Sequence, residues 1–208
     1  CEKLCESTLT EKRITDFLFG HSLISRCGVG YSLINKVCMK ISDLLSLFYS
    51  KRTEISANFS RVLPLNETLT DRWEKAEYLG FGEGTSIHDS AHVYGNVQVG
   101  SNTWIGPFCI LDGSCGLKIG SNCSISAGVQ IYSHDTVQWA VSGGKKDYEL
   151  EAVEIGSNCY LGPNCVIAKG VKLGDGCIVG ANSLVIDSFG PGLKVAGNPA
   201  KVIGNSNL

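Results

Sequence analysis

The chain has few charged side chains, few prolines and no long apolar run. Only 18% of its 208 residues are charged and 43% are hydrophobic, which excludes a disordered chain. The 18 basic and 20 acidic residues give a net charge of −2, so the basic footprint of a nucleic-acid-binding protein is missing. No apolar run reaches the roughly 18 residues of a membrane-spanning helix. Five prolines, and 25 glycines without a G-X-Y period, exclude collagen. A globular protein with a sizeable core remains.

The ten cysteines lack the spacing of a metal site. They contain no C-x-x-C pair and no zinc-ribbon spacing, so we expect no bound metal. Half of them fall in one column of the repeat described next, where a free cysteine packs as a small hydrophobic residue. We therefore expect reduced thiols and a cytoplasmic protein.

An aliphatic residue recurs every six positions in the C-terminal part of the chain. All 14 positions hold Ile, Leu or Val, although these residues make up only 52 of the 208. The series has two irregularities, an insertion of two residues after the fifth position and a long gap after the eighth. The positions are Ile87, Val93, Val99, Ile105, Leu111, Ile119, Ile125, Ile131, Ile155, Leu161, Ile167, Leu173, Val179 and Val185.

Two further columns accompany the aliphatic one. Two residues earlier stands a small or β-branched residue, and this column includes Cys109, Cys123, Cys159, Cys165 and Cys177. Three residues later stands Asn or Gly, which tolerate the left-handed backbone of a tight turn; this column reads Asn96, Asn102, Asn122, Gly128, Asn158, Asn164, Gly170, Gly176 and Asn182. Together the columns predict a parallel β-helix of hexapeptides with three hexapeptides per coil. We expect between four and five coils, roughly 22 Å in length at about 4.8 Å per coil.

The long interruption is the most informative part of the repeat. Two of the three positions that an unbroken repeat requires between Ile131 and Ile155 are not aliphatic, which predicts that residues 135–152 form an inserted loop. Long loops on rigid scaffolds are often functional. His134 stands three residues after Ile131, in the column that holds Asn or Gly at nine positions. A histidine at this position favours a chemical role over packing.

Three sequence features carry a family resemblance. They are the I-G-x-N-x-x pattern, the V-A-G-N-P-A-K-V-I sequence at 195–203 and the I-Y-S-H-D sequence at 131–135. With these features, residues 83–204 resemble the hexapeptide-repeat acyltransferases, and are most similar to sugar and polysaccharide O-acetyltransferases of the galactoside and maltose acetyltransferase type. The resemblance implies an all-β, left-handed parallel β-helix. It also implies a homotrimer that transfers acetyl from acetyl-CoA to a carbohydrate hydroxyl.

The resemblance assigns the general base to His134. In the family, the matching histidine takes the proton of the attacking hydroxyl and no acyl-enzyme forms. A neutral imidazole suits this role near neutral pH, and the chain has no G-x-S-x-G motif of a serine nucleophile. Asp135 is a candidate for orienting the ring. His88 and His92 lie more than two coils away from His134, too far for the three to bind one zinc ion as in γ-class carbonic anhydrases.

The resemblance also places the cofactor in the groove between neighbouring prisms of a trimer. The Ala181 backbone would contact the pantetheine arm, and Lys201 would contact the phosphates as a flexible point charge. Tyr160 stands where the family often has Trp beside this arm. Gly162 and Pro163 belong to the same cofactor-binding stretch, although Pro163 has no N–H to donate.

The acceptor site is expected around the histidine. A repeat of 18 residues plus the two-residue insertion places Asp112 and Ser114 in the coil beneath His134. Trp139, in the inserted loop, either stacks on a sugar ring or packs within the loop.

Two other functions stay open. One is N-acetylation of an amino sugar, often nucleotide-linked, because a single base serves both hydroxyl and amine acceptors. The other is a non-catalytic β-helix scaffold, which the histidine and its loop disfavour.

Residues 1–80 lack the repeat and are predicted to form an N-terminal helical segment, followed by the β-helix domain at 81–204 and a tail at 205–208. Apolar spacing predicts helices at 10–25 and 31–50. The second helix either packs on protein or lies on the inner face of the membrane. We expect a loop at 53–66, then a helix from Glu67 to Leu79 that ends at Gly80.

Overall fold

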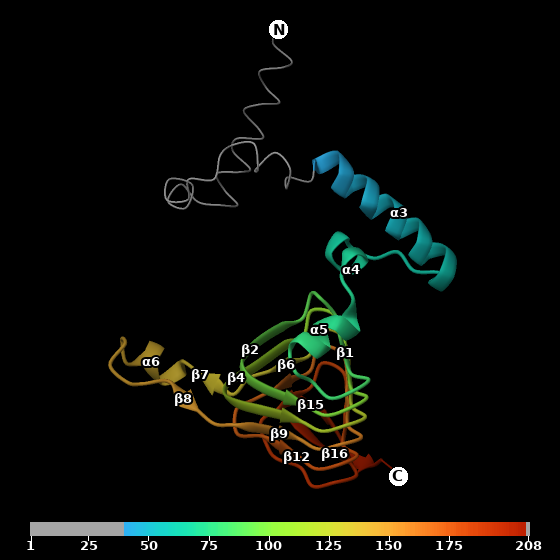
Figure 1. Ribbon diagram of the computed structural model, residues 1–208. Coiled ribbons are helices and arrows are strands. Elements are labelled where there is room, and N and C mark those ends of the chain that lie inside the picture. The colour runs from blue at the N-terminus through green and yellow to red at the C-terminus, as the bar shows by residue number, and fades with distance from the viewer. Residues whose placement is uncertain (1–39, 207–208) are drawn as a thin grey trace. The chain divides into compact units, whose positions relative to one another are not determined.

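The computed structural model describes residues 40–206 (Figure 1). The chain divides into two compact units, residues 1–49 and 50–208. The helix predicted at 10–25 and the first part of the helix predicted at 31–50 lie outside the described residues.

The first described helix is longer than expected at its C-terminal end. Helix α3 spans Ile41–Phe59, so the loop predicted at 53–66 is wrong over its first half. The stretch contains no Gly or Pro to stop the helix, and a Lys51–Glu54 ion pair of 3.0 Å lies on its surface. None of its side chains is buried. Of the helices between residues 40 and 206, none has both the length and the apolar character needed to cross a membrane.

The helix predicted from Glu67 to Leu79 is two helices. Helix α4 spans Leu65–Leu69 and ends where Thr70 takes an extended conformation. Helix α5 spans Arg72–Tyr78 and begins at Asp71, whose carboxylate accepts hydrogen bonds from two backbone amides of the first turn. The Asp71 cap explains why the second helix starts anew.

The remaining chain forms a β-solenoid with three faces, as predicted. Face 1 is a sheet of six parallel strands that ends in antiparallel β16: β1 (Ser86–Ile87), β3 (Trp104–Ile105), β5 (Ser124–Ile125), β10 (Tyr160–Leu161), β13 (Ile178–Val179), β15 (Leu193–Gly197) and β16 (Ala200–Asn205). Six parallel strands give six levels, more than the expected four to five, because the closing sequence at 195–203 adds β15 to the solenoid.

The other two faces share two long strands that continue around the corner between them. These are β2 (His92–Val99) and β4 (Ile110–Ile119), which pair in parallel along both faces. Face 2 is completed by β6 (Gln130–Ile131), β11 (Val166–Ile167) and β14 (Leu184–Val185). Face 3 is completed by β9 (Val153–Ile155) and β12 (Lys172–Leu173).

The repeat columns form the core. Thirteen of the 14 aliphatic positions are buried, and so are the five cysteines of the small-residue column. The six cysteines of the described chain are free. Burial raises the pKa of Cys109 to about 11 and that of Cys165 to about 12, so these thiols are inert packing groups near neutral pH.

The turn column has positive φ at eight of its nine predicted positions. At the ninth, Gly95 takes the positive φ in place of Asn96. Phe108 also turns with φ 60°, in a conformation that is unusual for an aromatic residue. His134 is not a turn residue: it begins strand β7 (His134–Asp135), which pairs with β8 (Glu149–Leu150) in the inserted loop. The expectation that His134 occupies a left-handed corner is therefore wrong.

The number of residues between successive inward positions varies at only one of the three corners of the solenoid. At the corners between faces 1 and 2 and between faces 3 and 1, six residues always separate successive inward positions. Between faces 2 and 3 the step is six, eight, 24, six and four residues: Val93 to Val99, Leu111 to Ile119, Ile131 to Ile155, Ile167 to Leu173, and Val185 to Phe189. The 24-residue step contains β7, helix α6 (Val137–Val141) and β8, which project from the solenoid (yellow in Figure 1).

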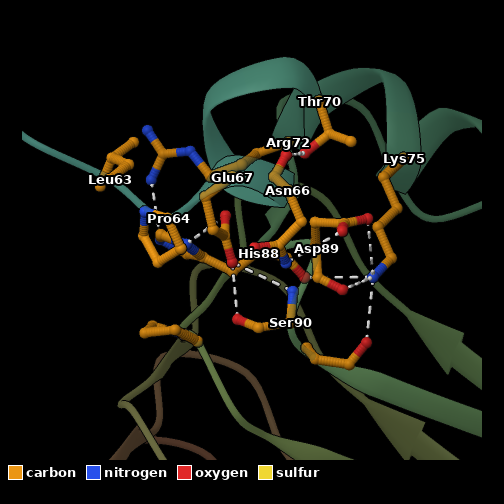
Figure 2. A network of polar contacts seen from close by, with 12 residues as sticks. Leu63, Pro64, Asn66, Glu67, Thr70, Arg72, Lys75, His88, Asp89 and Ser90 are labelled. Atoms are coloured by element: carbon orange, nitrogen blue, oxygen red, sulfur yellow. Dashed lines mark hydrogen bonds and ion pairs between the residues drawn. The ribbon is translucent and has the colours of Figure 1, made fainter. Parts of the chain in front are cut away.

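Polar contacts attach α4 and α5 to the first level of the solenoid (Figure 2). The Lys75 ammonium donates to three backbone carbonyls, those of His88, Asp89 and Ala91, at 2.8–3.2 Å. The buried Glu67 carboxylate accepts from the Ser90 hydroxyl at 2.6 Å and contacts His88 Nδ1 at 2.9 Å. These bonds satisfy backbone and side-chain groups at the end of the solenoid.

Candidate active site

The inserted loop begins with a histidine held by a buried carboxylate. His134 Nδ1 lies 2.5 Å from Asp112 Oδ2. Asp112 belongs to β4, one level below, and the predicted register is confirmed because Leu111 pairs with Ile131. The His134 side chain is 33% exposed, whereas the Asp112 side chain is 3% exposed. The pair therefore joins a buried anchor to an accessible ring.

Hydrogen bonds keep the Asp112 carboxylate ionised. Burial by itself raises its pKa, but hydrogen bonds from Ser114, His134 and Ser133 outweigh that effect and hold the pKa at about 2. One oxygen accepts from the Ser114 hydroxyl at 2.5 Å, and the other accepts from the Ser133 amide at 2.9 Å. An ionised carboxylate only accepts hydrogen bonds, so the proton of the neutral ring lies on His134 Nδ1. Nε2 then carries the free lone pair.

The exposed ring nitrogen is available for chemistry. Within residues 40–206, no group lies within hydrogen-bonding distance of His134 Nε2. A neutral imidazole in this orientation is able to accept a proton from a bound hydroxyl or amine. The buried carboxylate stabilises the imidazolium that forms.

Asp135 does not contact the ring. Its carboxylate lies 3.3 Å from Lys169 Nζ and accepts from the Val137 amide at 3.0 Å. Successive side chains of a strand point to opposite sides, and His134 and Asp135 are neighbours in β7. The structure thus gives the orienting contact expected of Asp135 to Asp112.

Ser114 and Trp139, the other two residues predicted for the acceptor site, make different contacts. Ser114 donates its hydroxyl and its amide to Asp112, so it supports the carboxylate. Trp139 lies in α6 and packs edge-to-face on Tyr148, with ring centroids 5.9 Å apart. Both rings stay about half exposed on the projecting loop.

The residues predicted to bind the cofactor gather at another part of the prism. Tyr160 lies on face 1, and Gly162 and Pro163 follow it at the corner between faces 1 and 2. Ala181 lies directly on the next level, because a Cβ on Gly162 would be 2.6 Å from the Ala181 amide nitrogen. Lys201 is in β16, where its ammonium contacts Asp187 at 3.1 Å.

Four of the five cofactor-binding candidates therefore lie on face 1 or at its corner with face 2, away from the corner of His134, whereas Lys201 reaches Asp187 in the step between faces 2 and 3. Pro163 and Ala181 are at the corner between faces 1 and 2, and His134 is at the corner between faces 2 and 3. A single chain does not bring these four residues and His134 together.

The other two histidines of residues 40–206, His88 and His92, have structural partners. His88 contacts Glu67 through Nδ1 and Arg72 through Nε2. His92 stacks on Tyr94 and contacts its hydroxyl at 3.1 Å. The described chain contains no group of three or more His, Cys, Asp or Glu side chains arranged to hold a metal ion.

Sequence reasoning placed Asp112 beneath His134 but did not assign it to the ring. The signal was present, because the register already stacked the carboxylate under the imidazole. Ser133 and Lys169 were not identified at all. Ser133 stands in an ordinary position of the repeat, and the contacts of Lys169 depend on how the loop returns to the solenoid.

Two family models match the solenoid. The "Bacterial transferase hexapeptide (six repeats)" model matches residues 152–187, and the "Hexapeptide repeat of succinyl-transferase" model matches residues 96–133. The two matches lie on either side of the inserted loop.

Several known acyltransferases are similar to the chain. Galactoside O-acetyltransferase of Escherichia coli is 27% identical over 129 residues, which cover 52% of this chain and 64% of that protein. The crystal structure of a maltose O-acetyltransferase from Clostridium difficile is 27% identical with a TM-score of 0.54, and the match covers 79% of this chain and 89% of that one. A Bacillus cereus N-acyltransferase in complex with dTDP and coenzyme A shares the fold at 21% identity, with a TM-score of 0.54 and coverage of 64% and 88%.

The chain spans between 46% and 64% of the length of three curated acetyltransferase relatives. The matched family models, the relatives and the six-level β-solenoid agree in one result: the chain is similar to the hexapeptide-repeat acyltransferases.

Proposed function

We propose that this protein transfers an acetyl group from acetyl-CoA to a hydroxyl of a sugar or polysaccharide. One observation carries the proposal: His134 is oriented by the ionised Asp112 and leaves Nε2 free at the root of the inserted loop. The relatives with galactoside and maltose O-acetyltransferase names support a carbohydrate acceptor. The imidazole–carboxylate pair also argues against a purely structural scaffold.

The proposed chemistry is a direct transfer. The acceptor hydroxyl attacks the thioester carbonyl while His134 Nε2 removes its proton. The new C–O bond forms, the C–S bond breaks, and the coenzyme A thiolate leaves with the proton returned from the imidazolium. Asp112 stabilises the imidazolium through a charge-assisted hydrogen bond. No group on the enzyme becomes acylated.

A homotrimer is part of the proposal. Four of the five cofactor-binding candidates lie away from the corner of His134 on one prism, so a complete site requires the cofactor corner of a neighbouring copy. Tyr160, Gly162, Pro163 and Ala181 would line the pantetheine arm, and Lys201 would contact the phosphates.

Subunit mixing tests this arrangement. An Ala181→Trp subunit loses cofactor binding and a His134→Asn subunit loses the base, so each homotrimer is inactive. Mixed trimers should regain activity, because some interfaces combine one intact cofactor corner with one intact histidine. Absence of recovery, with mixed assembly verified by native mass spectrometry, would contradict the shared site.

The acceptor is tested by thiol release from acetyl-CoA with a panel of sugars and oligosaccharides. An acetyl ester is cleaved by hydroxylamine, whereas an acetamide resists it. A hydroxylamine-stable product on an amino sugar would replace the O-acetyl assignment with N-acetylation. An absence of acetyl transfer in the full panel, with acetyl-CoA bound, would oppose the carbohydrate assignment.

A further inference from the structure

One lysine beside the candidate site pairs with three carboxylates. Lys169 Nζ lies 2.9 Å from Glu149, 3.3 Å from Asp135 and 3.3 Å from Glu151. Its side chain is 17% exposed, much less than those of the two glutamates. Hydrogen bonds to these acids, that to Glu149 foremost, raise the pKa of Lys169, so its charge is fixed at all working pH values.

These carboxylates come from both ends of the inserted loop. Asp135 lies in β7 where the loop leaves the solenoid, and Glu149 lies in β8 where it returns. Lys169 belongs to the next level of the solenoid, two residues after Ile167. A single side chain thus connects the two strands of the loop to the rigid prism.

Backbone hydrogen bonds at the same place join the returning end of the loop to the turn that carries the lysine. Glu151 donates its amide to the Ser133 carbonyl at 2.9 Å and accepts from the Gly170 amide at 3.2 Å. Gly170 has φ +75°, and a Cβ there would lie 2.4 Å from a Glu151 carboxylate oxygen. The turn that carries Lys169 is therefore fitted closely to the loop.

These contacts extend to the pair formed by His134 and Asp112. Ser133, bound by Glu151, donates its amide to Asp112, and Asp135 is the neighbour of His134. Carboxylates dominate the surroundings of the ring, and Lys169 is the cation paired with three of them in the described chain. The ionisable groups on the elements packed around the ring are Asp112 and Cys115 from β4, Asp135 from β7, Glu149 and Glu151 from the returning strand, Lys169, and the phenols Tyr94 and Tyr132.

We propose that Lys169 is a positioning residue for acyl transfer: it fixes both strands at the root of the loop and offsets their negative charge, so that His134 remains on Asp112 as a neutral base. The proposal rests on the function proposed above for His134. Without the lysine, the negative charge of the loop root, to which Asp135 contributes next to His134 in β7, is no longer offset and favours the protonated imidazole. The loop root also loses its connection to the prism.

The test compares the pH dependence of three variants with that of the wild type. Lys169→Met removes the charge but keeps an unbranched chain, and should move the acid limb of kcat/KM upward by about one pH unit. Lys169→Arg retains the charge and should restore the wild-type limb. Lys172→Met is the matched control, because it removes a comparable Lys–Glu ion pair of 3.0 Å on face 3; it should leave the profile unchanged.

A second measurement follows the imidazole without catalysis. The ¹⁵N signals of His134, titrated by NMR, should show the same upward displacement in Lys169→Met. The double variant Asp135→Asn/Glu149→Gln retains Lys169 and removes two negative charges, so its displacement should have the opposite sign. This double variant decides the question if Lys169→Met fails to fold.

The outcomes separate this inference from the proposed function. Activity that survives His134→Asn would refute the base assignment, while the NMR titration would still report on Lys169. Loss of activity in His134→Asn, with superimposable titrations of wild type and Lys169→Met, would overturn the role of Lys169 alone. An unshifted or upward-shifted limb in the double variant would overturn it as well.

Discussion

The described part of the chain contains two imidazole–carboxylate pairs, and they differ in what the second ring nitrogen contacts. At the beginning of the solenoid, His88 Nδ1 lies 2.9 Å from Glu67 and Nε2 lies 3.0 Å from an Arg72 guanidinium nitrogen (Figure 2). At the inserted loop, His134 Nδ1 lies 2.5 Å from Asp112, and Nε2 has no partner in the described chain. The two carboxylates are similarly buried.

Arg72 determines the state of the first pair. A guanidinium only donates hydrogen bonds, so His88 Nε2 must accept and its lone pair is occupied. The ring is also covered by the edge of Trp104, with centroids 6.0 Å apart. The same imidazole–carboxylate pair thus stabilises the fold at His88, whereas at His134 it is a candidate general base. The difference lies in access to one lone pair.

The strongest test of this contrast replaces each histidine by asparagine. General-base catalysis typically contributes about 10²–10⁴-fold, so His134→Asn should lower kcat by that factor. Asparagine still offers an N–H to Asp112 but cannot accept a proton near neutral pH. His88→Asn should leave kcat within about twofold. Steady-state kinetics with chemistry verified as rate-limiting provide the measurement, and more than a third of wild-type kcat in His134→Asn would exclude the base role.

Replacing the carboxylates should give a smaller effect with the same asymmetry. A hydrogen bond to a charged group contributes about 1.5–3 kcal/mol, so Asp112→Asn should lower kcat by roughly ten- to 150-fold. Glu67→Gln should change kcat little. Equal kcat losses in the two variants would break the comparison, because both pairs would then act on the reaction.

The pH dependence should show a single proton on the acid side. The pKa of Asp112 is about 2, so this group stays ionised across the working range. Only protonation of His134 then reduces the rate, and the logarithm of kcat/KM should fall with a slope of one on the acid side. A slope of two, in a range where circular dichroism shows a folded protein, would mean that a second group titrates with the base.

The variant with the smallest effect on kcat, His88→Asn, should show a clear loss of thermal stability. His88→Asn removes the ring that contacts both the buried Glu67 and Arg72, which costs about 1–3 kcal/mol. The melting temperature should fall by roughly 2–10 °C, while kcat per folded molecule is retained. An unchanged melting temperature would show that the His88–Glu67 pair does not stabilise the fold.

The solenoid could be predicted because its signal is repeated at every level. Each inward aliphatic residue supports the same register, and that register placed Asp112 under His134. The helical segment had no such redundancy: extension of α3 to Phe59 depends on the absence of a stop signal, and the division between α4 and α5 depends on a single cap at Asp71.

The site was harder to predict than the scaffold for a geometrical reason. Proximity in sequence favoured Asp135 as the partner of His134, but strand alternation in β7 directs it to Lys169. That alternation follows only once β7 is known to pair with β8. The ion pairs of Lys169 depend on the path of the returning chain, which no local pattern specifies.

The confinement of length changes to one corner separates two kinds of variation. At the other two corners the spacing is six residues at every level, so the level and register of Gly162 and Ala181 stay the same whatever the loop contains. The corner with His134 accommodates steps from four to 24 residues without moving any inward position. The inserted loop can therefore be replaced without changing the rest of the solenoid; under the proposed function, such a replacement would alter the surroundings of the acceptor and leave the proposed cofactor corner unchanged.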